Sequence, residues 1–175
     1  TATTQNPHLA EDACRQDFAV WMPYDPTRPI SGVSLTDEGT RKTHGRRLHN
    51  IRANRYVAGT GWGAAERIDT DNEWFASFPQ IAVDASGNAI AVWSQNDGTH
   101  RHNIWANRYA VGTGWGTAEL IEMNDGDGAR SPQIAVDARG NAIAVWSHKD
   151  DSGNCSIWAN RDIAGTGWDT AGGVG

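Results

Sequence analysis

The sequence lacks several features that would place it in common classes of protein. No apolar run reaches the roughly 18 residues that a membrane-crossing helix needs, so we expect no transmembrane segment. Two cysteines, Cys14 and Cys155, are too few for a disulfide framework, and free thiols or a bridge between chains both stay open. Lys and Arg number 15 against 21 Asp and Glu, a net charge of −6. Because nucleic-acid binding needs clustered positive charge, we expect no such partner.

Tryptophan and glycine are abundant instead. The 175 residues include nine Trp and 20 Gly, while hydrophobic residues make up only 38%. A lean apolar content with many glycines indicates short strands joined by tight turns and anchored by a few large rings. This tryptophan-rich composition, with its many Asn and Thr residues, leads us to expect a secreted or cell-surface protein.

Three related copies of one segment follow each other at a constant spacing. The string GTGW occurs three times at steps of 53 residues, and the strings IRANRY, IWANRY and IWANRD keep the same spacing. The GTGW strings end at Trp62, Trp115 and Trp168, and the other strings begin at Ile51, Ile104 and Ile157. A period of about 50 residues made of short strands is typical of one blade of a β-propeller.

The second copy indicates how one blade is built. Alternation of side chains predicts four antiparallel strands, over 79–84, 89–93, 104–109 and 117–121. The strand over 89–93 would turn Ile90 and Val92 to one face, and its alanines and Trp93 to the other. A bulky face and a small face on each sheet would let neighbouring sheets stack and interdigitate.

We therefore predict an all-β protein, a β-propeller of four-stranded antiparallel blades with three blades per chain. The blades span 1–66, 67–119 and 120–175, and the first carries an insertion at about 26–45. Propellers close with about four to eight blades, so we expect a homodimer that completes a six-bladed ring. A piece of a longer propeller is the alternative, and a β-sandwich or β-solenoid would also accommodate strands of this spacing.

The copies differ most in two sets of loops, which join the second strand to the third and the last strand to the next copy. In a propeller both sets emerge at one rim, and variation on a constant scaffold indicates a binding face. Trp74 lies in such a loop without a counterpart in the other copies, so it is our first candidate for stacking on a sugar ring. Trp105 and Trp158 are further candidates for ligand binding.

An Asn-Arg pair recurs in every copy, at 54–55, 107–108 and 160–161. A structural interpretation pairs the arginine with a carboxylate on a neighbouring strand or blade, because a buried charge needs a partner. A functional interpretation has Arg108 and Glu119 grip a hydroxyl-rich ligand beside Trp115.

The histidines of the variable loops suggest a metal site. His100 and His102 flank Arg101, so on an extended chain they share a face and could chelate one ion. His49 and His148 are further candidate ligands. Copper or zinc suits such ligands, whereas calcium has weaker support because 124–128 lacks the spacing of an EF-hand. Loop histidines that bind nothing are the alternative.

The strings VDASGNAIAVW, NIWANRYAVGTGWGTAELI and PQIAVDARGNAIAVW resemble repeats of secreted or lipid-anchored bacterial propeller proteins. The Gly-x-Gly-Trp element is also loosely similar to that of the fucose-binding lectin propellers, which can assemble a six-bladed ring from short chains. This likeness implies that Arg108, Glu119 and Trp115 would contact ligand. The Ser-x-Asp-x-Gly-x-Thr-Trp pattern of the sialidase Asp-box is absent.

Catalytic motifs are missing from the sequence: it has no nucleophile elbow, phosphate loop or repeated acid pair, so we name no catalytic residue. We expect a non-enzymatic, lectin-like propeller that recognises carbohydrate at the variable rim. A metal-binding surface protein and a structural module of a larger assembly are the alternatives.

Overall fold

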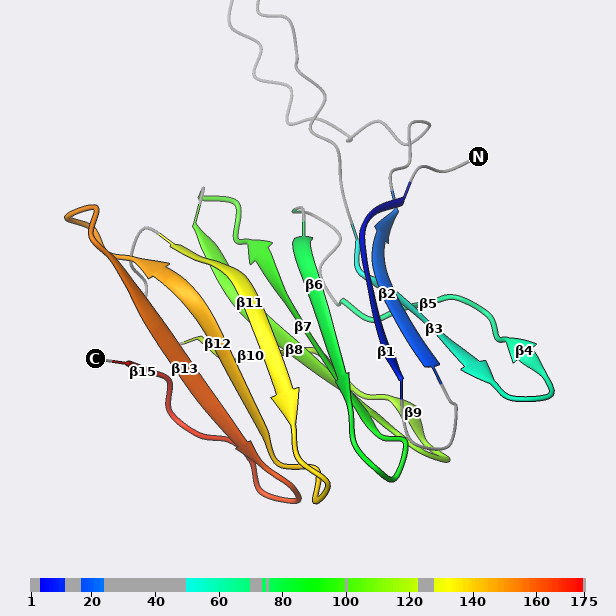
Figure 1. Cartoon of the computed structure of the whole chain (residues 1–175). Coiled ribbons are helices and arrows are strands. Elements are labelled where there is room, and N and C mark those ends of the chain that lie inside the picture. The colour runs from blue at the N-terminus through cyan, green and yellow to red at the C-terminus, as the bar shows by residue number, and fades with distance from the viewer. Residues whose placement is uncertain are drawn as a thin grey trace, which may run out of the picture.

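A computed structural model gives the fold and describes residues 4–11, 17–23, 50–69, 74, 76–99, 101–122 and 128–174 (Figure 1). Three antiparallel sheets stand side by side, and the described residues form strands and turns. Across these ranges no helix is long and apolar enough to cross a membrane. The predicted insertion at 26–45 falls outside the described residues.

Each sheet has three long strands and two short pieces at its outer edge. Sheet 1 contains β1 (Thr4–Glu11), β2 (Asp17–Pro23), β3 (Arg52–Val57), β4 (Gly61–Trp62) and β5 (Glu66–Arg67). Sheet 2 contains β6 (Ala76–Val83), β7 (Ala89–Asn96), β8 (His102–Ala110), β9 (Gly114–Trp115) and β10 (Glu119–Leu120). Sheet 3 contains β11 (Gly128–Val136), β12 (Ala142–Lys149), β13 (Cys155–Ile163), β14 (Gly167–Trp168) and β15 (Gly172–Gly173).

The outer edge differs from the predicted single strand over 117–121. In sheet 2, β9 and β10 both pair with β8 and are separated by a short gap. In this gap the Asn107 side-chain amide donates to the Gly116 carbonyl oxygen at 3.0 Å. The repeated asparagine thus occupies the space where the strand ladder is interrupted.

The first strand of sheets 2 and 3 bulges next to a repeated proline. Pairing with the second strand shifts register between Ser77 and Gln80 in β6, and at the corresponding place in β11. Phe78 and Ser131, each directly before the proline, have positive φ values of 52° and 53°. Because proline has no N–H to donate, the hydrogen-bond ladder breaks at this point.

Two apolar cores lie between the sheets. One lies between sheets 1 and 2 and contains Ala89, Ala91 and Trp93, and the other lies between sheets 2 and 3 and contains Ile90 and Val92. This confirms the predicted faces of the strand over 89–93. Trp93 and Trp146 are fully buried, as core positions require. Sheet 2 is therefore covered on both faces, and each core joins the bulky face of one sheet to the small face of the next.

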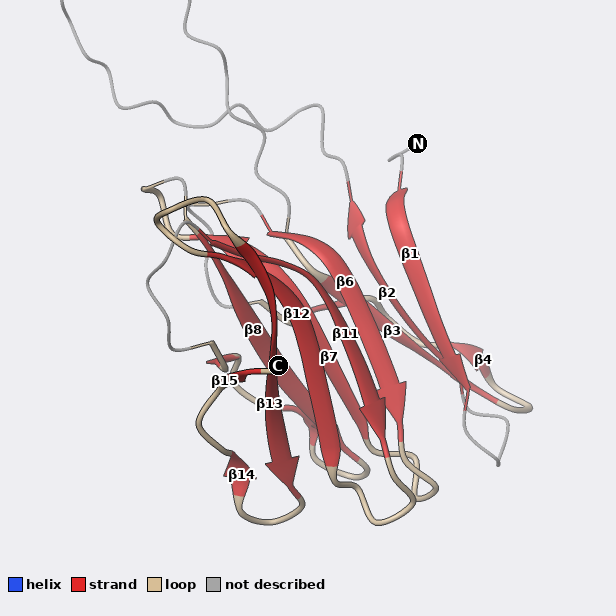
Figure 2. Cartoon of the chain, turned by 60° about the vertical axis from the view of Figure 1, so that its left-hand side comes forward, coloured by secondary structure: helices blue, strands red, loops and turns tan. Residues whose placement is uncertain are grey.

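The two ends of the sheets carry different connections (Figure 2). We call one end the loop rim: there β7 joins β8 through 97–101, and β12 joins β13 through 150–154. The opposite end, the turn rim, carries the connections 84–88, 111–113, 137–141 and 164–166. The first strands of successive sheets contact one another, β1 with β6 and β6 with β11, as the inner strands of a propeller do.

Candidate functional site: the loop rim and the polar joints behind it

Two connections of the turn rim, 84–88 and 137–141, form the same turn. Asp84 Oδ1 accepts hydrogen bonds from the backbone N–H groups of Ser86 (2.8 Å) and Asn88 (2.9 Å), and its Oδ2 accepts one from the Asn88 amide (2.8 Å). Asp137 repeats this arrangement in sheet 3, where the Asn141 amide holds the pKa of Asp137 below its usual range. This end of the molecule is a constant scaffold.

The loop rim, by contrast, differs between sheets 2 and 3. In sheet 3, Asp150 and Asn154 form the same turn that the turn rim uses, with the amide donating to Asp150 Oδ2 at 3.1 Å. In sheet 2 the hairpin is held by Asp97, which accepts from the Thr99 backbone N–H and hydroxyl, both at 2.8 Å. Variation in sequence therefore becomes variation in loop structure at this rim.

Trp74, the first candidate for ligand stacking, lies against the sheet 2 hairpin that Asp97 holds. Its indole ring approaches Gly98 so closely that a Cβ at Gly98 would clash with the ring. Gly98 also has φ of 91°, a conformation that glycine adopts with least strain. The Trp74 side chain is half-buried. A partly accessible ring in contact with a polar hairpin has the character of a ligand platform.

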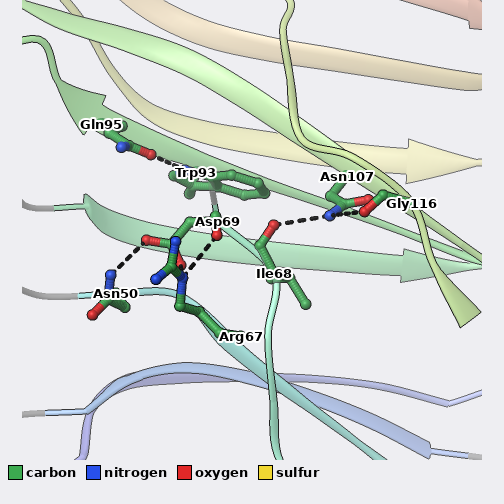
Figure 3. A network of polar contacts seen from close by, with 8 residues as sticks. All are labelled: Asn50, Arg67, Ile68, Asp69, Trp93, Gln95, Asn107 and Gly116. Atoms are coloured by element: carbon green, nitrogen blue, oxygen red, sulfur yellow. Dashed lines mark hydrogen bonds and ion pairs between the residues drawn. The ribbon is translucent and has the colours of Figure 1, made fainter. Parts of the chain in front are cut away.

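Behind the loop rim, a polar network surrounds buried Asp69, which lies in the connection from sheet 1 to sheet 2 (Figure 3). The Asn50 amide donates to Asp69 Oδ2 at 3.0 Å, and Arg67 Nε lies 3.0 Å from Asp69 Oδ1. Burial raises the pKa of Asp69 above its ordinary value, while the Asn50 hydrogen bond and the Arg67 charge oppose that rise. Nearby, the Trp93 indole donates to Gln95 Oε1 at 2.9 Å.

We call the interface between two neighbouring sheets a joint. At the joint between sheets 2 and 3, different side chains occupy the positions equivalent to the Asp69 network. Glu122, 53 residues after Asp69, is buried, and its Oε1 lies 3.8 Å from Nδ1 of buried His148. The His148 ring also packs against Trp158, with ring centroids 5.0 Å apart. Both ring nitrogens of His148 and the Trp146 indole N–H lack hydrogen-bond partners in the part of the chain that the structure describes.

The predicted loop histidines are not loop residues where the structure describes them. His102 begins β8 and His148 lies in β12, and both are buried, so the prediction that these two histidines lie in loops is wrong. The strands run further than predicted, which leaves only short hairpins between them. His49 and His100 lie outside the described residues, as does Cys14, whereas Cys155 is an exposed free thiol.

His102 packs at the joint between sheets 2 and 3. The Ser94 hydroxyl lies 3.3 Å from His102 Nδ1 and donates to the Ala129 carbonyl oxygen of sheet 3 at 3.0 Å. Burial lowers the pKa of His102, with a further decrease from Arg130 and an opposing increase from Asp97. Among the described residues, no three His, Cys, Asp or Glu side chains gather in a way that could hold a metal ion. Copper, zinc or calcium binding stays a prediction.

The side chains predicted to grip a ligand together point in different directions. Arg108 reaches sheet 3, where its guanidinium pairs with Asp162. Trp115 packs on the opposite side of sheet 2, against the core shared with sheet 1. Glu119 is exposed on the outer edge. The structural interpretation of the Asn-Arg repeat, an arginine paired with a carboxylate on a neighbouring sheet, therefore holds for Arg108. Arg55 instead donates to the Tyr109 hydroxyl of sheet 2.

Two further candidates, Trp105 and Trp158, lie in the third strands of their sheets. Each is half-buried and packs against a different inter-sheet core. The Trp158 indole donates to the Ser156 hydroxyl at 3.1 Å. Their rings therefore belong at least partly to the joints, and ligand contact by either stays a prediction.

Sequence reasoning missed the buried acids of the two joints. Asp69 and Glu122 occupy the same position in successive copies, 53 residues apart. An acid retained at one repeat position is a signal that could have found them.

Comparison with known proteins supports the fold. No family model and no curated protein matches the chain. Among solved structures, the Hadza microbial sialidase Hz136 superposes with a TM-score of 0.58 at 13% identity, over 94% of this chain and 36% of that one. A protein of unknown function from Dyadobacter fermentans DSM 18053 gives 0.65 at 9% identity, over 97% and 50%. The endo-arabinase from Bacteroides thetaiotaomicron VPI-5482 gives 0.51 at 16% identity, over 97% and 61%.

These similarities define a class of fold. The protein is all-β, with antiparallel sheets in a propeller-like arrangement. It spans between about a third and three-fifths of the length of these solved chains. At such identities the likeness concerns the fold alone.

Proposed function

We propose that this protein is a non-enzymatic carbohydrate-binding propeller that recognises its ligand at the loop rim. One observation carries the proposal, namely that sheets 2 and 3 share the same Asp-Asn turn at the turn rim, while their hairpins at the loop rim differ. A constant scaffold with a variable rim is how binding faces are built on repeat folds. Display of this rim outside the cell would suit the expected secreted or surface location.

Two further observations favour sugar as the ligand. Trp74 presents a fixed indole ring at this rim, and flat aromatic rings with polar neighbours suit the mixed apolar and hydroxylated surface of a sugar. Two of the similar solved structures are named as a sialidase and an endo-arabinase. The resemblance of the Gly-x-Gly-Trp element to lectin propellers favours the same class of ligand.

Two described acids at or behind the loop rim, Asp150 and Asp69, favour binding over hydrolysis. A glycosidase needs a carboxylic acid that stays protonated near neutral pH, so its pKa must be raised. Asp150 of the loop rim has the opposite property, because the Asn154 amide and backbone N–H groups hold its pKa below its usual range. Asp69 has a raised pKa but is buried in a joint between sheets. These acids serve the structure.

A glycan array followed by tryptophan-fluorescence titration tests the proposal. We expect binding to at least one class of glycan, with affinity reduced at least tenfold by Trp74→Ala. Trp62→Ala is the matched control, because Trp62 is also partly exposed but belongs to the outer edge next to the turn rim, and it should leave affinity unchanged. No binding across a broad panel, or equal losses in both variants, would contradict the proposal.

The finer architecture is part of the same proposal. We infer that the three sheets are half of a six-bladed ring, with one blade to each segment predicted from the repeat. A second copy of the chain would supply the other half and would place two loop rims on one face. Two binding rims on one particle would raise avidity for a glycan surface.

A further inference from the structure

Sheet 3 exposes an apolar face whose counterpart on sheet 2 is fully covered. Ile143, Ile157 and Val174 are 49%, 51% and 58% exposed. The residues 53 positions earlier, Ile90, Ile104 and Ile121, are 2%, 0% and 1% exposed, because sheet 3 covers them. The open face of sheet 3 thus has the apolar character of an inter-sheet core that no further sheet of the chain covers.

The two joints within the chain share a backbone-directed hydrogen bond. Asn107 of sheet 2 donates from its side chain to the Ile68 carbonyl oxygen of sheet 1 at 2.8 Å. Asn160 of sheet 3 donates in the same way to the Ile121 carbonyl oxygen of sheet 2 at 2.9 Å. Sheets 2 and 3 are therefore each hydrogen-bonded to the outer edge of the sheet that precedes them.

The joints also share an arginine contact in the reverse direction. Arg55 of sheet 1 donates to the Tyr109 hydroxyl of sheet 2 at 3.1 Å, with its guanidinium 5.4 Å from the ring centroid. Arg108 of sheet 2 pairs with Asp162 of sheet 3. In both cases the acceptor lies 54 residues after the arginine, so the register of the two joints is the same.

Sheets 1 and 3 carry counterparts of the groups that join the sheets within the chain. Within the described residues, the side-chain NH2 group of Asn54 in sheet 1 and the guanidinium of Arg161 in sheet 3 donate no hydrogen bond, while Asn54 Oδ1 accepts from the Arg55 backbone N–H at 2.8 Å. The same residue spacings can be applied to sheet 3 of one copy packed on sheet 1 of a second copy. They would place Arg161 opposite the second copy's Tyr56, and that copy's Asn54 opposite the Val174 carbonyl oxygen. The Val174 N–H donates to the Ile157 carbonyl oxygen at 2.7 Å within sheet 3, just as the Ile121 N–H donates to the Ile104 carbonyl oxygen at 2.9 Å within sheet 2.

We propose that sheet 3 of one copy docks on sheet 1 of a second copy, with Arg161 on the second copy's Tyr56 and that copy's Asn54 on the Val174 carbonyl oxygen. This inference deepens the proposed ring and rests on it. The contact is head-to-tail, so each copy uses both ends, and two copies with two identical joints close a ring of six sheets. Closure covers both open faces, whereas an unclosed contact would leave one face free at each end.

The mass of the 175-residue chain in solution tests the joint first. Light scattering after size exclusion should give twice the chain mass of 18.9 kDa. Ile157→Asp places a charge in the open face, and because Ile157 is exposed in the single chain, the variant should fold and run as a monomer. Val111→Asp is the matched control, because Val111 is 50% exposed in a turn of the turn rim, and it should stay dimeric.

The pairing of Arg161 with Tyr56 is tested by a second pair of variants. Tyr56→Asp reproduces the Arg108–Asp162 contact in the third joint, and sheet 3 already carries Asp at this repeat position. It should lower the dimer dissociation constant several-fold and make it more sensitive to salt. Arg161→Glu combined with Tyr56→Asp should raise that constant at least tenfold through like-charge repulsion.

Several results would overturn the joint. A wild-type chain that stays monomeric at tens of micromolar, or that forms trimers or open polymers, excludes the two-copy ring. If the Ile157→Asp variant remains dimeric, or if neither charge variant changes the dimer dissociation constant, the dimer does not use this surface. Because the readout is mass, a failure here is distinguishable from a failure of sugar binding, which is measured by titration.

Discussion

The guanidinium of Arg108 in sheet 2 pairs with the carboxylate of Asp162 in sheet 3, although the two residues lie 54 positions apart in the sequence. The Asp162 side chain is 2% exposed, while that of Arg108 is 37% exposed. The preceding joint places the Tyr109 hydroxyl at the corresponding position, where it accepts from Arg55. One repeated arginine therefore serves two joints with different acceptors.

Removing Arg108 should cost more than changing its acceptor. Arg108→Ala leaves the buried Asp162 carboxylate without its cation, and we expect the free energy of unfolding to fall by about 1–3 kcal/mol after allowance for the solvent-exposed arginine. Asp162→Tyr recreates the other joint and should cost less than half as much. Urea denaturation of both variants at one fixed protein concentration measures the difference. An equal or larger loss for Asp162→Tyr would count against this account.

Acid should destabilise the protein through His102. Burial lowers the pKa of His102 in the folded state, with Arg130 adding to the decrease and Asp97 opposing it. Below about pH 6.5 the His102 ring of the unfolded chain binds a proton, whereas burial disfavours the protonated ring in the folded state. The free energy of unfolding therefore falls as pH drops, by up to about 1.4 kcal/mol per pH unit. In His102→Asn this part of the slope should disappear. Unfolding curves of the two proteins between pH 7.5 and about 5.5 compare the slopes, and identical slopes would exclude the effect.

The faces of the inner strands could be predicted from the sequence alone. Ile90 and Val92 alternate with alanines, and this period of two assigned each side chain to its core. Trp93 followed from the same pattern. Local alternation was sufficient because these strands are covered on both sides by copies of the same sheet.

The polar ends of the strands could not be predicted in this way. The segment around Gln95 and His102 is polar and reads as a loop, yet both residues are buried. The burial of His102 depends on the paired strand and on sheet 3, because the Ser94 hydroxyl lies 3.3 Å from its Nδ1 and donates to the Ala129 carbonyl oxygen. Gln95 accepts from the Trp93 indole two residues earlier on the same strand. Only the hairpin at 150–154 carried a local signal, because its Asp-x-x-Gly-Asn pattern repeats that of the turn rim.

The Asp69 network should respond to pH in the opposite sense from His102. Burial raises the pKa of Asp69, so just above its ordinary value of 3.8 the folded state holds a proton that the unfolded chain has released. Stability from this group therefore decreases as pH rises through that window and is lower at neutral pH. Asp69→Asn keeps the Arg67 hydrogen bond to the backbone carbonyl oxygen of residue 69 and removes the titration.

We accordingly expect Asp69→Asn to be less damaging at pH 7 than at about pH 4. Urea denaturation at the two pH values gives the difference in free energy of unfolding between variant and parent. Asn50→Ala is a second test, because it removes the amide that stabilises the Asp69 carboxylate. It should therefore lower the free energy of unfolding more at pH 7 than at low pH. The reverse order for either variant would contradict the assigned direction.

Gly98 should tolerate substitution less well than a glycine of similar backbone conformation elsewhere. Gly98 and Gly112 have φ values of 91° and 86°, so alanine at either position carries a strain of about 1–2 kcal/mol. Nothing lies within 4 Å of a Cβ at Gly112, whereas a Cβ at Gly98 would collide with the Trp74 ring. Overpacking should therefore add about 1–3 kcal/mol to the cost of Gly98→Ala.

A double-mutant cycle separates the collision from the backbone strain. Because Trp74→Ala removes the ring, Gly98→Ala should cost no more in that background than Gly112→Ala does in the parent. In the parent background the displaced ring should also weaken glycan binding, while Gly112→Ala leaves it unchanged. Equal costs of Gly98→Ala with and without Trp74 would show that the ring moves aside freely, and Trp74 would then be too loosely held to serve as a fixed platform for a sugar.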